Sequence, residues 1–339
     1  MNARKLWNTL GPGILLAAAS VGASHLVFSP QAGARFGYQL LWLVVASHLF
    51  KYPAFEFGPR YAAATGHHLL DGYARIPGPK NWALIVFLLS TLVQGVGVLA
   101  GVVSIAGSVL ATWTNLLSTE WFSLLLTASI VALLLAGGFS WLDHLNKMMM
   151  AVLAAATVLA FLPILPGPEV LPHLVVPALP AGSLVLVAAM LGWMPTGIDV
   201  SVWHSFWTVE KMRQLQRGDA SGAKPTPYEQ LRMSLLDMRI GYGLSLGTGL
   251  MFVIMGAVHL AGRGDALRGV QFAQELSVAY TNIFGRWMYH VFMLTAFFAM
   301  FSTSYTVIDG FSRSFSECCA LLFSPLGTPG RRKRIYVGF

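Results

Sequence analysis

Hydrophobic residues recur along the chain in long runs that are separated by short polar stretches. Eight of these runs hold enough apolar residues, about 20, to cross the hydrocarbon core of a bilayer as a helix. The pattern predicts an all-α integral membrane protein in which residues 1–339 form a single polytopic transmembrane domain. The runs lie at residues 11–34, 38–60, 82–112, 121–139, 146–166, 181–208, 234–261 and 284–322.

The composition agrees with this pattern and limits the classes of function. Hydrophobic residues make up 55% of the chain and charged residues only 11%, whereas a soluble domain carries about 25% charged residues. The lipid bilayer is therefore the expected partner. The net charge of +8 does not require nucleic acid, because basic loops also orient membrane proteins. The sequence shows no nucleophile–base grouping and no phosphate-binding loop, so we expect neither an enzyme nor a cofactor.

The positions of lysine and arginine predict the orientation of the chain. With the N-terminus in the cytoplasm, most of these residues fall in cytoplasmic connections, whereas Arg35, Arg263, Arg268 and Arg286 fall outside. This bias follows the positive-inside rule. We therefore expect a cytoplasmic (plasma) membrane of bacterial type, with the N-terminus on its cytoplasmic side. The longest polar connection, residues 209–233, is expected to be a flexible cytoplasmic loop.

Two of the runs are interrupted where a helix would cross the middle of the bilayer. The first contains Gly-Ala-Ser-His at residues 22–25, and the sixth contains Met-Pro-Thr-Gly at residues 194–197. Unpaired peptide groups in lipid cost on the order of several kcal/mol each, so a break is tolerated where it lines a cavity. Breaks in corresponding helices of two halves indicate the binding site of an inverted-repeat transporter. Two kinks that serve helix packing are the alternative.

Five residues at these breaks are candidates for binding a substrate. The carbonyls of Gly22 and Trp193 and the side chains of His25, Met194 and Asp199 are the available groups. Imidazole and thioether suit softer divalent ions such as Mn, Fe, Co or Zn, and a carboxylate supplies charge. Each side chain also has a structural alternative. His25 is then a neutral histidine bonded to a helix carbonyl, Met194 fills the core, and Asp199 caps the following helix.

Lys51 is a candidate for the transport pathway. It lies deep in the second run, just before Pro53. A lysine at this depth either extends its ammonium group to the interface or stands in the cavity as a fixed positive charge. A fixed cation opposes a metal pathway and favours an anionic or zwitterionic solute.

Other charged residues have mainly structural interpretations. Glu56 and Arg60 are four positions apart, as are Asp309 and Arg313, and this spacing places each pair on one helix face. Both are therefore expected to be ion pairs. Asp237 lies near the start of the seventh run, where it is a candidate for a helix cap or a gate residue.

Several segments resemble the Nramp family (natural resistance-associated macrophage proteins), which are divalent-metal transporters. They are "GPGILLAAASVGASHLVFSPQAGARFGYQLLW" (11–42), "GWMPTGIDVSVW" (192–203), "LLDMRIGYGLSLGTGL" (235–250) and "FSTSYTVIDGFSRSFSE" (301–317). The resemblance runs along nearly the whole chain. It implies a leucine-transporter-like fold of two inverted five-helix repeats with broken helices 1 and 6, and transport by alternating access.

The sequence departs from the family pattern at the residues that the family uses for metal. The family's first break reads Asp-Pro-Gly-Asn, and here residues 22–25 occupy those places. The metal-binding methionine is kept as Met194, but the histidine after Met-Pro is Thr196. The acidic pair associated with proton movement corresponds to Thr91 and Gln94. Gln94 and Thr196 are therefore candidate pathway residues without the family's usual chemistry.

The second five-helix repeat is expected to be incomplete. Five runs precede residue 181 and three follow it, so we expect two helices to be missing, in a fragment or in a truncated gene product. The predicted function is an Nramp-like secondary transporter of a divalent metal cation. The alternatives are a carrier of a small organic or anionic solute on the same fold, and a sensor or scaffold that does not transport.

Overall fold

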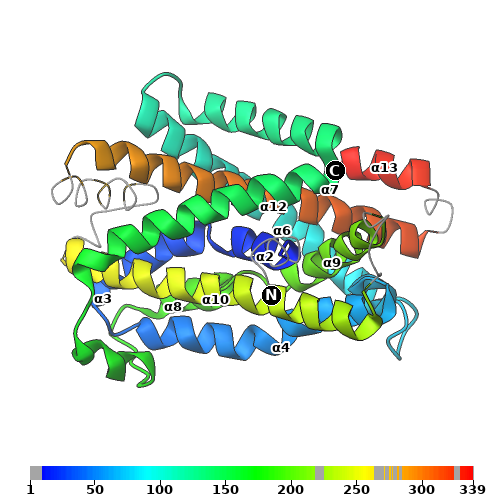
Figure 1. Cartoon of the computed structure of the whole chain (residues 1–339), viewed down its shortest axis with the longest axis horizontal. Helices are drawn as coiled ribbons and strands as arrows, with labels where there is room; N and C mark the ends of the chain where they lie inside the picture. The colour runs from blue at the N-terminus through cyan, green and yellow to red at the C-terminus, as the bar shows by residue number, and fades with distance from the viewer. Residues whose placement is uncertain are drawn as a thin grey trace.

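The described part of the chain folds entirely into helices and connecting turns in the computed structural model (Figure 1). The structure describes residues 10–217, 225–262, 271, 275, 277, 281, 285–323 and 329–338. Its helices, including the π-helix η1 and the 3₁₀-helices η2 and η3, are α2 (Pro12–Ser20), η1 (Ser24–Phe28), α3 (Ser29–Phe36), α4 (Leu41–Thr65), α5 (Leu69–Tyr73), α6 (Trp82–Thr114), α7 (Thr119–Phe161), η2 (Leu162–Ile164), η3 (Pro168–Leu174), α8 (Leu184–Trp193), α9 (Val200–Arg217), α10 (Pro227–His259), α12 (Trp287–Leu322) and α13 (Pro329–Gly338). The predicted all-α membrane fold is confirmed.

Five helical segments of the described part are long and apolar enough to cross a membrane. They are α6, α10, α12, the first half of α7 (Thr119–Gly137), and the second half of α7 together with η2 (Phe139–Ile164). Figure 1 shows the ribbon of α7 turning back on itself between its two halves. A Cβ atom at Gly137 would collide with the Trp141 ring, so the absence of a side chain at this position permits the reversal.

The two predicted breaks are present. The first apolar run is divided into α2 and the helical stretch Ser24–Phe36, which meet at an angle of 45°. The sixth run is divided into α8, which ends at Trp193, and α9, which begins at Val200. The broken helices 1 and 6 of the predicted fold are thereby confirmed.

Two predicted spans are helical, but α4 carries charged residues and α8 is short. α4 is 25 residues long, but it carries Lys51, Glu56 and Arg60 among its apolar residues. α8 is only 10 residues long, so it needs α9 to complete a crossing. The assignment of these elements as membrane spans remains a prediction.

The predicted loop at 209–233 is mostly helical where the structure describes it. α9 continues to Arg217, and α10 begins at Pro227. The start of α10 is fixed by Thr226, whose side chain accepts the Glu229 N–H while the Glu229 side chain accepts the Thr226 N–H. This capping box satisfies peptide groups that would otherwise lack partners. Residues 218–224 of the predicted loop lie outside the described residues.

α2 occupies the interior of the helical assembly. Figure 1 shows it between α10 and α4 on one side and α12 and α7 on the other. It contacts α7, α9, α10 and α12, and all of its residues are buried. A helix that is apolar on every face is expected in such a position. The first break therefore lies deep inside the molecule.

Both ion pairs predicted from four-residue spacing are formed. Arg60 bonds Glu56 on α4. On α12, Arg313 Nε donates to Asp309 at 2.8 Å, and Asp309 is fully buried. The Asp309 carboxylate also accepts the Trp207 Nε1–H at 2.9 Å. These hydrogen bonds satisfy a carboxylate that would otherwise be costly to bury.

Candidate functional site

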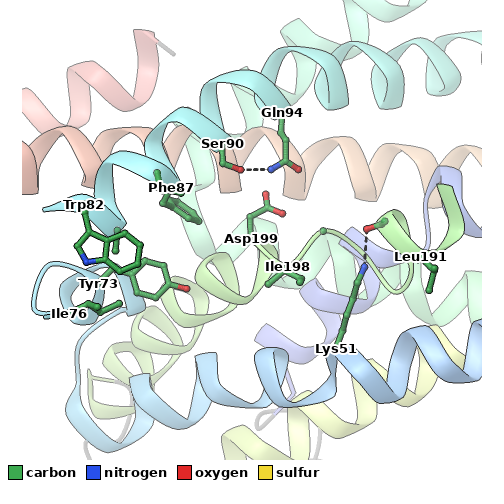
Figure 2. Close-up of a pocket in the computed structure, with 14 residues that line it drawn as sticks. Lys51, Tyr73, Ile76, Trp82, Phe87, Ser90, Gln94, Leu191, Ile198 and Asp199 are labelled. Atoms are coloured by element: carbon green, nitrogen blue, oxygen red, sulfur yellow. Dashed lines mark hydrogen bonds between the residues drawn. The ribbon is translucent and has the colours of Figure 1, made fainter. Parts of the chain in front are cut away.

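A cavity of about 320 Å³ lies between the two helix breaks, and we call it the inner cavity. It joins a larger cavity of about 720 Å³, the outer cavity, which is bounded by α4, α5, α6 and the second break (Figure 2). Four residues line both cavities, namely Gln94, Gly192, Gly197 and Asp199. The two cavities therefore meet beside the residues of the second break and α6.

Asp199 supplies the carboxylate of this site. It immediately precedes Val200, the first residue of α9, so it stands at the N-terminal end of that helix. On α6, the Gln94 side-chain amide donates to Ser90 Oγ at 2.6 Å. Figure 2 shows the Asp199 carboxylate pointing toward this Ser90–Gln94 pair. A negative charge at a helix N-terminus is favoured by the peptide dipoles, so capping and substrate binding are compatible roles for Asp199.

Lys51 bonds the backbone on both sides of the second break. Its Nζ donates to the carbonyl of Gly192 at 2.8 Å and to that of Thr196 at 3.1 Å. Carbonyls in the last turn of a helix lack partners within the helix, and a cation is favoured there. Lys51 therefore fastens α4 to the second break, and it also lines the outer cavity.

His25 lies in η1 and faces away from both cavities. It is fully buried, and its Nε2 is 2.9 Å from the carbonyl oxygen of Ser245 on α10. Its Nδ1 is 2.8 Å from Ser24 Oγ. The hydroxyl of Ser245 also lies 3.1 Å from Nε2 of His48, which comes from α4. These contacts match the structural alternative for His25, in which a neutral imidazole is bonded to a helix carbonyl.

Met194 also lies outside the lining of the two cavities. It is fully buried in an apolar cluster with Val44 and Val253. A Cβ atom at Gly249 would lie 3.2 Å from Met194 Cε and 3.4 Å from His25 Nε2, so both side chains approach α10 at this glycine. The structure brings Met194 near His25 but does not bring either of them to Asp199. Within the described residues, no three His, Cys, Asp or Glu side chains are grouped to hold a metal ion.

The inner cavity is also lined by the remaining predicted residues, Gly22, Trp193 and Thr196. The carbonyls of Gly22 and Thr196 already accept hydrogen bonds. The Gly22 carbonyl already accepts the N–H groups of His25 at 3.1 Å and Leu26 at 2.9 Å, which uses both of its acceptor positions. The Thr196 carbonyl accepts Lys51. Trp193 is the last residue of α8 and lines the inner cavity there. The two breaks therefore shape the cavity more than they supply it with open carbonyls.

Sequence reasoning missed two kinds of lining residue. Ser90 is four positions before Gln94, and this spacing on a helix was a usable signal. Trp203 and Phe311 line the inner cavity. Their rings pack edge to face, with the ring centroids 4.7 Å apart. The Trp203 ring lies against Gly310, where a Cβ atom would collide with it. Such a contact between distant helices is not visible in the sequence.

The chain matches the family described as "Natural resistance-associated macrophage protein-like" over residues 13–308. It is 31% identical over 320 residues to an uncharacterized protein of Pasteurella multocida, covering 92% of this chain and 71% of that protein. It is 28% identical to the divalent metal cation transporter MntH of Chromohalobacter salexigens, covering 75% of this chain and 58% of that protein.

Two solved structures with the same fold are named as transporters. The manganese transporter of Eremococcus coleocola has a TM-score of 0.66 at 18% identity, covering 98% of this chain and 74% of that chain. Mhp1, a nucleobase-cation-symport-1 family transporter, has a TM-score of 0.62 at 16% identity, covering 97% of this chain and 70% of that chain. These likenesses confirm the leucine-transporter-like fold. The chain thus belongs to the Nramp family, a family of membrane transporters and not of enzymes.

Proposed function

We propose that this chain carries a divalent metal cation across the membrane by alternating access, with the inner cavity as the binding site. The observation that carries the proposal is the position of Asp199, whose carboxylate lies where the inner and outer cavities meet. The Nramp match and the similarity to a protein named as a divalent metal cation transporter support this class of substrate. An acidic residue in the interior of a membrane protein is a functional candidate by default.

The donors around the cavity favour a hard cation. Asp199 and Gln94 line the cavity with oxygen atoms, whereas the softer donors of His25 and Met194 lie elsewhere. Carboxylate, carbonyl and water ligands suit Mg, Ca and Mn. Six water molecules at about 30 Å³ each occupy about 180 Å³, which fits within the inner cavity of about 320 Å³. The expected cargo is therefore a divalent ion such as Mn²⁺ or Mg²⁺ that keeps most of its water.

The two breaks support alternating access as the mode of transport. Each divides a helix into halves that meet at the inner cavity, α2 with η1 and α3, and α8 with α9. Halves of a broken helix turn about the break more readily than a continuous helix bends. Movement of one half at a time would open the cavity to one side of the membrane while the other half keeps it closed.

An organic cation is a second candidate for the cargo. Trp193, Trp203 and Phe311 line the inner cavity together with Asp199. Aromatic faces beside a carboxylate are a known arrangement for binding an ammonium group. A small amine would then fill the volume that we assign to the hydration shell of a metal ion.

Uptake into proteoliposomes that contain the purified chain tests the proposal. We expect Mn²⁺ to enter and to quench a trapped indicator dye. We expect Asp199→Asn to slow the initial rate by about tenfold or more, because the negative charge that attracts the cation is removed. Asp71→Asn is the matched control, because Asp71 lies on α5 beside His68 and lines neither cavity.

Three results would oppose the proposal. Uptake of a small amine without uptake of Mn²⁺ or Mg²⁺ would favour the organic carrier. A chain that moves none of these substrates would favour the sensor or scaffold. Equal rates for wild type and Asp199→Asn would contradict the assignment of the inner cavity as the binding site.

A further inference from the structure

A buried carboxylate from another helix caps the N-terminal end of α2. Asp237, on α10, is 2% exposed. Its Oδ1 accepts the Gly11 N–H at 3.0 Å, and its Oδ2 accepts the Gly13 N–H at 2.7 Å. The first N–H groups of a helix have no partner within the helix, and Pro12 has none to offer. Asp237 therefore satisfies two of the peptide donors at this end of α2.

The backbones of α2 and α10 touch at the same place. A Cβ atom at Gly13 would collide with the Asp237 carbonyl, and one at Gly241 would collide with the Gly13 carbonyl. No side chain separates the two helices here, which allows the short hydrogen bonds to Asp237. The other end of α2, at Ala19 and Ser20, lines the inner cavity.

A second buried carboxylate ties the other broken helix to α7. Asp143 Oδ2 accepts from Lys147 Nζ at 2.9 Å and from Lys211 Nζ at 3.0 Å. The three side chains are 3%, 4% and 10% exposed. Asp143 and Lys147 belong to α7, and Lys211 belongs to α9. The ion pairs thus fix the far half of the second broken helix to α7.

The two ties meet at Gly11. A Cβ atom there would lie 2.8 Å from Asp143 Oδ1 and 3.3 Å from Lys211 Nζ, while the Gly11 N–H bonds Asp237. Asp143 Oδ1 has no hydrogen-bond partner among the described residues. Asp143, Asp237 and Lys211 therefore meet at the start of α2, and Lys147 joins this cluster through its ion pair with Asp143.

We propose that Asp237 and Asp143 are positioning residues for transport, which keep the wall of the inner cavity that α2 forms closed by holding α2 and α9 against α10 and α7. The inference rests on the proposed function, in which α2 and α9 are moving halves of broken helices. Removal of one partner leaves another buried charge or donor unpaired, which weakens such a cluster strongly. Release of these contacts frees α2 to swing about the first break and exposes the residues of its last turn.

Cysteine labelling in vesicles tests this closure without any transported ion. Ala19→Cys is the reporter, because Ala19 is 6% exposed and lines the inner cavity. Cys318 and Cys319, both buried, are replaced by alanine in the background. A membrane-impermeant maleimide is applied separately to each side of the membrane. We expect Asp237→Asn and Asp143→Asn each to speed labelling by about tenfold or more when the maleimide is applied to the side of the membrane at which α2 begins. Labelling from the opposite side should not change.

Asp309→Asn is the matched control. Asp309 lies on α12 and is fully buried. It bonds Trp207, Arg313 and Tyr336, and none of these partners belongs to α2 or α10. Faster labelling in this variant than in wild type, to the same extent as in Asp237→Asn, would show general loosening and overturn the closure. Asp237→Glu, which keeps the charge, is expected to restore slow labelling at least partly. Labelling that stays slow in both Asp237→Asn and Asp143→Asn would also overturn it.

The labelling result and the transport result are separable. Faster labelling in a protein that moves no cation supports the closure and contradicts the proposed function. Unchanged labelling in a protein that transports Mn²⁺ contradicts the closure and leaves the proposed function standing.

Discussion

Lys51 Nζ on α4 donates a hydrogen bond of 2.8 Å to the carbonyl of Gly192, in the last turn of α8. The same nitrogen reaches the Thr196 carbonyl across the break. A lysine of α4 thus satisfies the backbone where the second helix is interrupted, and its charge complements the negative end of the α8 dipole. The break is held open by a side chain from a neighbouring helix and not only by Pro195.

Replacing Lys51 should destabilise the second break. Lys51→Met removes both hydrogen bonds and leaves two carbonyls without that donor, and the loss is about 1 kcal/mol because the group is partly exposed. We expect a lower midpoint in thermal unfolding, with Lys51→Arg close to wild type. Lys80→Met, at an exposed position outside the cavities, is the control. Equal melting of Lys51→Met and wild type would refute the capping role.

Close contact between α2 and α10 should make one glycine of α10 irreplaceable. Gly241→Ala places a Cβ atom against the Gly13 backbone, and overpacking of this kind costs about 1–3 kcal/mol. Gly243 is two positions further along the same helix and has nothing within 4 Å of a Cβ atom, so Gly243→Ala should be nearly neutral. The measurement is the thermal midpoint in detergent. A similar loss in both variants would mean that helix flexibility, not the contact, matters at Gly241.

Loss of the soft donors should leave cation binding nearly unchanged. Met194 and His25 line neither cavity, and Met194→Leu conserves volume in an apolar cluster, which costs less than about 1.5 kcal/mol of stability. We expect the dissociation constant for Mn²⁺, measured by calorimetric titration, to change less than about twofold in Met194→Leu and His25→Gln. A tenfold weakening in either variant would restore the ligand set that the sequence indicates.

Docking of α13 should weaken at alkaline pH. The Tyr336 hydroxyl donates to Asp309 Oδ1 at 2.9 Å, and burial together with the Asp309 carboxylate raises the pKa of Tyr336 above its usual value, about 10. A raised pKa in the folded state means that this contribution to stability is present below the unfolded pKa and is lost as the pH rises beyond it. Thermal melts between about pH 8 and pH 11 should therefore fall more steeply for wild type than for Tyr336→Phe. Parallel curves would contradict the contribution of this phenol.

The sequence was sufficient to predict the broken-helix fold, because its signals are local. Uninterrupted apolar runs mark the long helices, and the breaks at 22–25 and 194–197 stand out against them. The predicted loop at 209–233 was too long, although Thr226 and Glu229 already had the spacing of a capping box. The polar residues of this segment suggested a loop, but residues 209–217 form the last turns of α9 and residues 227–233 the first turns of α10, which extend beyond the apolar parts of these helices.

The directions of the site residues were not predictable in the same way. In an unbroken helix Asp199 would point about 140° away from Met194, and only the backbone between Trp193 and Val200 decides the actual angle. That segment sends Met194 into the apolar cluster and Asp199 into the cavities. His25 likewise depends on its partner Ser245, a residue 220 positions away. Contacts of this kind are a property of the folded chain.

The most direct test of the binding site is the location of a bound Mn²⁺ ion by anomalous diffraction from crystals of this chain grown with the metal. We predict a single strong peak in the inner cavity beside the Asp199 carboxylate, and no peak there in crystals of Asp199→Asn. A peak between His25 and Met194 near Gly249, or no peak at the helix breaks in wild type, would contradict the account.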